Sequence, residues 1–138
     1  MFLKAVHVCE DVRIEENGTF TLVGVHSERI FVPVDQGEIR VPRLLVVAMV
    51  GGLAGADRLR FRQWLRAADD ASIEPPAMAE QAHDAAADEH NFVFGDAPMV
   101  FPGIGVYEVA LDVEAAGTSA AYRYRFRLER APAVRSAP

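Results

Sequence analysis

The sequence predicts an all-β protein, an antiparallel β-sandwich of about eight or nine strands, with room for one short helix within residues 77–91. Residues 103–130 contain two long segments in which apolar and charged residues alternate around a polar turn. An alternation with a period of two buries its apolar set only in a strand. Further short apolar segments, separated by turn residues, follow one another along the chain, which is typical of a sandwich.

The first strand is expected at residues 1–16, and it returns through a turn at Asn17-Gly18 to a second strand at 19–25. A two-residue loop would mix apolar and polar residues on each face, so we expect a three-residue loop over 16–18. This loop needs Gly18 in the left-handed region. The register that it predicts pairs Ile14 with Phe20 and Val12 with Leu22.

The middle of the chain is expected to supply three more strands. Residues 29–32 predict a short strand that ends at Pro33. The segment 44–50 is almost entirely apolar and ends in two glycines, which predicts a central strand buried on both faces, with a buried helical turn as the alternative. Residues 57–66 alternate again.

Residues 67–91 interrupt this pattern because they are rich in alanine and acidic residues. Helix propensity is good there, but the apolar face is thin, so a surface helix and a loop fit equally well. Strands resume at 92–94 and 99–101, before the closing hairpin. We expect one domain over 1–130 and a flexible tail over 131–138.

The bulk composition narrows the classes of function. The net charge of −6 gives no general attraction to nucleic acid or to anionic membranes. A single cysteine, Cys9, excludes an internal disulfide and a cysteine-rich zinc site. The start is charged too early for a signal peptide, and the longest apolar run, 44–56, is too short to span a bilayer. The expected compartment is therefore the cytoplasm.

Two rows of arginines, together with a tryptophan of the same parity, form the main candidate for an interaction surface. Its residues are Arg58, Arg60, Arg62, Trp64, Arg66, Arg123, Arg125 and Arg127. Such rows bind phosphates or acidic partners. The simpler interpretation, which we favour, is a solvated face in which the arginines pair across the hairpin with Glu108, Asp112 and Glu114. Pairs of this kind contribute ~0.2–1 kcal/mol each.

The position of the aromatic residues argues against nucleic-acid binding. In the closing hairpin the aromatic residues and the arginines have opposite parity, so the rings are expected inside and cannot stack on bases. Trp64 is the exception. It lies on the outer face as a partner-binding residue, unless a bulge turns it inward.

No catalytic, cofactor-binding or metal-binding residues are predicted. On a helix, His83 and His90 would lie about 10 Å apart along the axis, too far to share one metal ion, although a loop would reopen that question. Cys9 stands beside two acidic residues, which raise rather than lower a thiol pKa. The segment 26–28 has the residue types of a catalytic triad, but adjacent strand residues face opposite ways.

The stretch Cys9–Arg13, followed by Asn17-Gly18 and Leu22–Val25, resembles the opening of a family of small bacterial domains of unknown function. The segment 101–107 and the final hairpin also fit, so the resemblance covers both ends of the chain. It implies a β-sandwich-like fold and a bacterial cytoplasmic setting, and it carries over no catalytic residue. Residues 66–91 do not match and look like an insertion.

The leading hypothesis for function is a non-catalytic module that binds a protein partner or itself and uses no cofactor. The alternative is a small-ligand or carbohydrate-binding module that uses loops at one end of the sandwich, where Trp64, His26 and Asp35 would be the residues to examine. A hydrolase or metal-dependent enzyme is the third hypothesis.

Overall fold

The computed structural model describes residues 1–16, 19–33 and 37–132, and these residues form twelve strands and no helix. The strands are β1 (Phe2–Cys9), β2 (Asp11–Ile14), β3 (Phe20–Val23), β4 (Arg29–Val32), β5 (Ile39–Val41), β6 (Leu44–Gly51), β7 (Arg58–Ala67), β8 (Ala79–Ala82), β9 (His90–Asp96), β10 (Met99–Phe101), β11 (Gly105–Ala115) and β12 (Thr118–Arg130). The predicted all-β sandwich is confirmed, with more strands than expected.

The expectation of a short helix within residues 77–91 is wrong, because this segment contains β8. Strand β8 pairs with the first residues of β7, and Glu80 forms an ion pair with Arg58 at 3.2 Å. Pairing with a neighbouring strand satisfies the backbone and overrides the helix propensity of alanine and glutamine.

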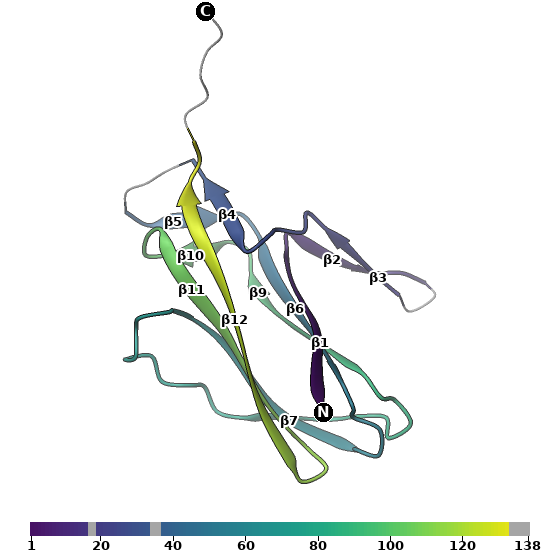
Figure 1. Ribbon diagram of the computed structural model, residues 1–138. Helices are drawn as coiled ribbons and strands as arrows, with labels where there is room; N and C mark the ends of the chain where they lie inside the picture. Colours follow the sequence, from purple (N-terminus) through teal and green to yellow (C-terminus); the bar gives the residue numbers. More distant parts are fainter. Residues whose placement is uncertain (17–18, 34–36, 133–138) are drawn as a thin grey trace, which may run out of the picture.

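The larger layer is a five-stranded sheet with the order β4-β12-β11-β7-β8. Figure 1 labels four of these strands, β4, β12, β11 and β7. The centre of the sheet is the predicted closing hairpin, in which Ala115 pairs with Thr118 around a two-residue turn. Both turn residues, Ala116 and Gly117, have positive φ, as this kind of turn requires. The sheet is antiparallel except for β4, which pairs in parallel with the end of β12. The two strands are not joined by a hairpin, so no turn forces them to be antiparallel.

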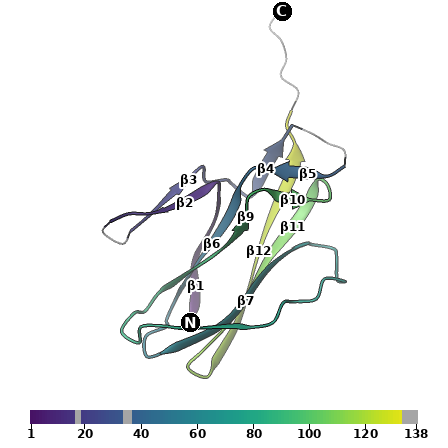
Figure 2. The ribbon, with the colours of Figure 1, turned by 180° about the vertical axis from the view of Figure 1, so that it is seen from behind.

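The second layer is a three-stranded sheet with the order β1-β6-β9. Strand β6 is its centre, as predicted, and it is buried on both sides. Leu44 and Val46 face the core, while Val47 on the opposite side is only 2% exposed. Two small ribbons, β2–β3 and β5–β10, complete the fold, and Figures 1 and 2 show β2–β3 projecting from the body.

The β2–β3 ribbon has the register that the alternation predicts. Val12 lies opposite Leu22, and Ile14 lies opposite Phe20. The Glu15 backbone N–H donates to the Thr19 carbonyl oxygen at 2.8 Å, which closes the loop after residue 14. The prediction about Gly18 falls outside the described residues, as does most of the tail expected at 131–138.

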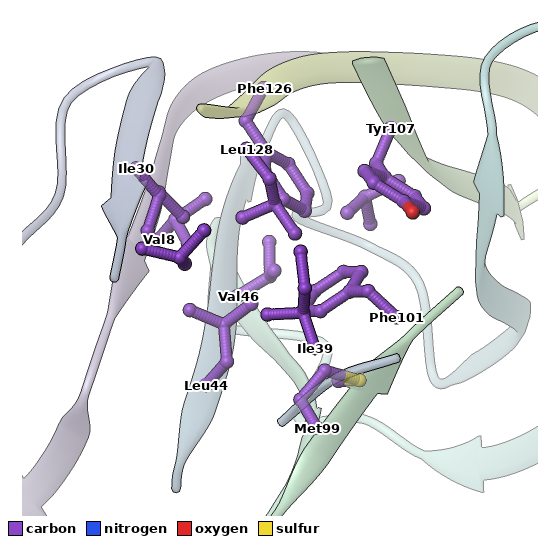
Figure 3. Packing of buried hydrophobic residues seen from close by; sticks show 12 residues of the cluster. Val8, Ile30, Ile39, Leu44, Val46, Met99, Phe101, Tyr107, Phe126 and Leu128 are labelled. Atoms are coloured by element: carbon purple, nitrogen blue, oxygen red, sulfur yellow. The ribbon is translucent and has the colours of Figure 1, made fainter. Parts of the chain in front are cut away.

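The core lies between the two sheets, and the inward-facing residues of β11 and β12 occupy its centre (Figure 3). The Phe101 ring contacts Tyr107 at 4.8 Å and Phe126 at 6.1 Å between centroids. The Tyr107 hydroxyl donates to the Gly103 carbonyl oxygen at 2.5 Å, which fixes the entry into β11. Because the apolar set of this hairpin is buried, its charged set must face outward.

Candidate functional site

The outward side of the five-stranded sheet, which we call the outer face, carries eight of the thirteen arginines of the chain. Among the described residues its strands present eight arginines: Arg29, Arg58, Arg60, Arg62, Arg66, Arg123, Arg125 and Arg127. They present five carboxylates: Glu80, Glu108, Asp112, Glu114 and Glu129. The outer face therefore has an excess of three positive charges in a chain of net charge −6.

The central strand of the sheet supplies acids, and the strands on either side supply arginines. Asp112 of β11 accepts from Arg62 of β7 at 2.8 Å and from Arg123 of β12 at 3.0 Å. Glu114 accepts from Arg60 at 2.6 Å. The predicted pairing of the arginine rows with the acids of β11 is thus confirmed in part, because Arg58 pairs instead with Glu80 and Arg127 with Glu129. The β7–β11 register places an arginine directly opposite each of the three acids, whereas Arg123 lies opposite Ala110 and reaches Asp112 diagonally.

Glu108 is the one buried charged residue among those described, and two arginines hold it from opposite sides. Its carboxylate accepts from Arg66 Nη2 at 2.9 Å and from Arg125 Nε at 2.9 Å. Burial by itself would raise the pKa of Glu108. The two arginine hydrogen bonds and their charges outweigh burial, so the pKa lies below its ordinary value and the carboxylate stays ionised.

Trp64 lies on the outer face between two guanidinium groups. The Arg123 group stands 5.1 Å from the ring centroid and the Arg62 group 5.5 Å, both within the range of cation–π attraction. The β7–β11 register runs without a bulge, so Trp64 keeps the parity of the arginines as the alternation predicts. Its partner across the strands is Ala110, a small residue that is fully buried.

The arginines of β12 keep much of their hydrogen-bonding capacity despite these pairs. The Arg125 side chain is 63% exposed, and only its Nε donates to Glu108. A guanidinium carries five N–H donors, so most of those on Arg125 can still reach a ligand. A shallow depression of about 370 Å³ adjoins it and is lined by Glu28, Arg29, Arg127 and Glu129, among others.

Sequence reasoning missed part of this surface because β4 pairs in parallel, far from its sequence neighbours. Strand β4 adds Arg29, which donates to Glu129 at 3.1 Å from Nε, and the half-exposed Phe31 beside it. The alternation of Arg29 and Phe31 with the buried Ile30 was the signal that would have assigned both to one outward side.

The two histidines of the segment 83–90 lie together, contrary to the spacing expected on a helix. Their ring centroids are 5.8 Å apart because the chain turns between them, where the Ala87 N–H donates to the Asp84 carbonyl oxygen. His90 Nε2 lies 3.1 Å from Gln81 Nε2, and His83 Nε2 lies 2.9 Å from the Ala87 carbonyl oxygen. In the described part of the chain no three His, Cys, Asp or Glu residues gather as a metal site, so this pair stands alone.

The other residues considered from the sequence are not brought together. Cys9 is fully buried in β1, and burial, followed by the charge of Asp11, raises its thiol pKa. His26 bridges to Val8 at the edge of the three-stranded sheet, whereas Trp64 lies on the outer face of the other sheet. Asp35 lies outside the described residues.

Within the described ranges there is no helix that is long and apolar enough to cross a bilayer. No family model and no curated protein matches the chain. The resemblance of Cys9–Arg13 and Leu22–Val25 to a family of small bacterial domains therefore stays a prediction.

Proposed function

We propose that the protein is a non-catalytic interaction module that binds an acidic segment of a protein partner on its outer face. The observation that carries the proposal is that arginines outnumber carboxylates by three on this one surface of an acidic chain. A positive surface on an otherwise negative molecule attracts acidic partners to one place and repels them elsewhere.

The internal carboxylates of the outer face favour protein over nucleic acid as the partner. Glu114 and Glu129 are partly exposed between the arginines, at 43% and 21% of their side chains. A continuous phosphate backbone would meet these negative charges, whereas a protein segment can place its own acids only opposite arginines. Trp64 at the centre offers a large, partly buried contact of the type that dominates protein interfaces.

The proposal keeps the cytoplasmic setting expected from the single cysteine of the chain. Self-association competes with this proposal, because the acidic segments of a second copy of the chain could occupy the outer face in place of another protein. Nothing in the arrangement of Trp64 and His26 favours the alternative of a common small-ligand pocket, since the two residues belong to different sheets.

The experiment uses poly-L-glutamate as the acidic probe and the fluorescence of Trp64, the only tryptophan of the chain, as the readout. We expect a saturable change that weakens as salt is raised, since exposed charges are screened. The variant Arg125→Glu/Arg127→Glu should weaken binding by about tenfold or more. The matched control, Arg13→Glu/Arg40→Glu, makes the same charge change away from the outer face and should stay within about threefold.

Two results would contradict the proposal. One is the absence of any poly-L-glutamate binding at low salt by the folded protein. The other is an equal loss of affinity in both double variants, because that would make net charge, and not the outer face, the cause.

A further inference from the structure

Strand β7 is longer than the strand that covers its outer edge. β7 runs over Arg58–Ala67, but β8 pairs only with residues 58–61. On the side away from β11, residues 62–67 have no strand partner within the described chain. An edge of this kind presents unpaired backbone N–H and C=O groups, which can pair with another extended chain.

The segment that links β7 to β8 does not pair with this edge, although Arg66 Nη1 donates to the Asp70 carbonyl oxygen of the link at 3.3 Å. Residues 71–77 are exposed at every position, and Figures 1 and 2 show the link leaving the sheet as a wide loop. Its backbone hydrogen bonds near β7 run from Ala68 to Val106 and from Asp70 to Ala67. No backbone hydrogen bond joins the described link to residues 62–66.

The inward side chains of β7 are not all covered. Leu59 is fully buried, but Phe61, which lies opposite Ala79 of β8, is only partly buried. Leu65, beyond the end of β8, is also only partly buried. A further strand in line with β8 would add cover to Leu65.

Strand β8 shows which side chains a strand at this edge places beside the arginines of β7. Glu80 lies opposite Arg60 on the outer face and forms an ion pair with Arg58. Beyond β8 the outward residues of β7 are Arg62, Trp64 and Arg66. Two more arginines therefore continue the row, and the strand that pairs with Arg58 and Arg60 does not reach them.

We propose that an extended acidic peptide adds to the five-stranded sheet as a further strand along residues 62–67 of β7, in line with β8. This proposal rests on the proposed function and specifies how the acidic partner binds. Backbone pairing gives affinity, and alternate side chains give specificity. The peptide places acids opposite Arg62 and Arg66, a small residue opposite Trp64 and apolar residues toward the core.

The probe is acetyl-Ser-Glu-Val-Ala-Val-Glu-Ser-amide, whose two glutamates have the spacing of Arg62 and Arg66. Two further peptides have the same side chains but carry N-methyl groups at every odd or at every even residue. In a paired strand only alternate N–H groups face the sheet. One N-methyl series should therefore bind about tenfold or more weakly, while the other stays within about threefold of the parent.

Two further measurements locate the peptide on the edge. Outward-pointing amides among residues 62–66 should exchange fast in the free protein and slowly in the complex. Arg62→Gln/Arg66→Gln should weaken peptide binding by about tenfold, whereas Arg13→Gln/Arg40→Gln, away from the outer face, should change it by less than about threefold. If the double variant does not fold, as judged by its thermal unfolding, the comparison of the two N-methyl peptides with the native protein still tests strand addition.

The outcomes separate this proposal from the proposed function. Equal binding by both N-methyl series, or no peptide binding while poly-L-glutamate still binds, overturns strand addition and leaves the acid-binding face standing. Failure of the peptide and of poly-L-glutamate together overturns both. Peptide binding with unchanged exchange at 62–66 also overturns strand addition, because the contact would then lie elsewhere.

Discussion

Arg66 donates from Nη2 to Glu108 Oε1 at 2.9 Å and so joins β7 to β11 through a carboxylate that is only 5% exposed. Arg125 reaches the other oxygen of the same group from β12. One buried carboxylate thus links the three central strands of the outer face. A buried ion pair stabilises a fold little compared with apolar packing, but the loss of one partner is costly.

Replacement of this carboxylate by an amide should therefore destabilise the protein. Glu108→Gln keeps the shape but removes the charge that both arginines face, and we expect the free energy of unfolding to fall by about 1–3 kcal/mol. Urea titration measures the change. The control is Glu114→Gln, whose side chain is 43% exposed and should cost less than about 1 kcal/mol. Equal losses in the two variants would contradict the central role of Glu108.

Stability should also fall in mild acid because of His90. Burial, and then the charge of His83, lower the His90 pKa below the ordinary value of 6.5. The unfolded chain therefore binds a proton more readily than the folded protein, so stability is highest above pH 6.5 and falls as the pH drops below it. Thermal unfolding between pH 7.5 and about 5 measures the slope. His90→Gln should flatten it.

The Glu108 carboxylate affects stability in a lower pH range than His90 does. Its pKa in the folded protein lies below the ordinary value of 4.5, so its contribution is complete above pH 4.5 and is lost as the pH falls through the lower value. The two effects can be told apart, because only the decline above pH 5 should respond to His90→Gln. A decline in that range that persists unchanged in the variant would assign it to another group.

Gly95 should tolerate no side chain, because β9 and β6 approach closely there. A Cβ atom at Gly95 would overlap the carbonyl oxygen of Leu44 and the side chain of Leu45. We expect Gly95→Ala to lower the free energy of unfolding by about 1–3 kcal/mol. Gly103→Ala is the matched control, since a Cβ there meets nothing within 4 Å. A stable Gly95→Ala protein would show that the two strands can move apart.

The turn between β11 and β12 offers a stabilising substitution. Ala116 has a φ of 50°, a conformation that costs alanine more than asparagine. Ala116→Asn should raise the free energy of unfolding by about 0.5–1 kcal/mol, because asparagine favours this turn position. Gly117→Ala places alanine at a φ of 78° and should have the opposite sign. Chemical denaturation of both variants checks the pair.

The alternation of residues was enough to predict much of the fold and the outer face. It placed the arginines of β7 and β12 on an outward face with the acids of β11 and set the register of β2–β3, but it left open that β7 lies beside β11. It could do so because a period of two leaves one side of a strand to bury. It could not assign Arg29 to the same surface, because parallel pairing of β4 with β12 depends on tertiary packing and leaves no turn signal.

The segment 67–91 was the part that local patterns could not determine. Its alanines and acids are compatible with a helix, but four of its residues pair with β7, and this pairing decides their conformation. His83 also lies beside His90 in the fold, so the distance between them could not be obtained from their spacing alone. The open edge at residues 62–67 was hidden for a related reason, because it depends on where β8 stops.

The uneven distribution of charge gives the molecule an electric dipole. The outer face carries a net charge of +3 and the rest of the chain the balance of −9, so the protein has a permanent dipole with its positive end on one sheet. An acidic partner that approaches from any side turns the molecule before contact, which raises the fraction of productive encounters. Association rates should therefore depend on ionic strength more steeply than dissociation rates do.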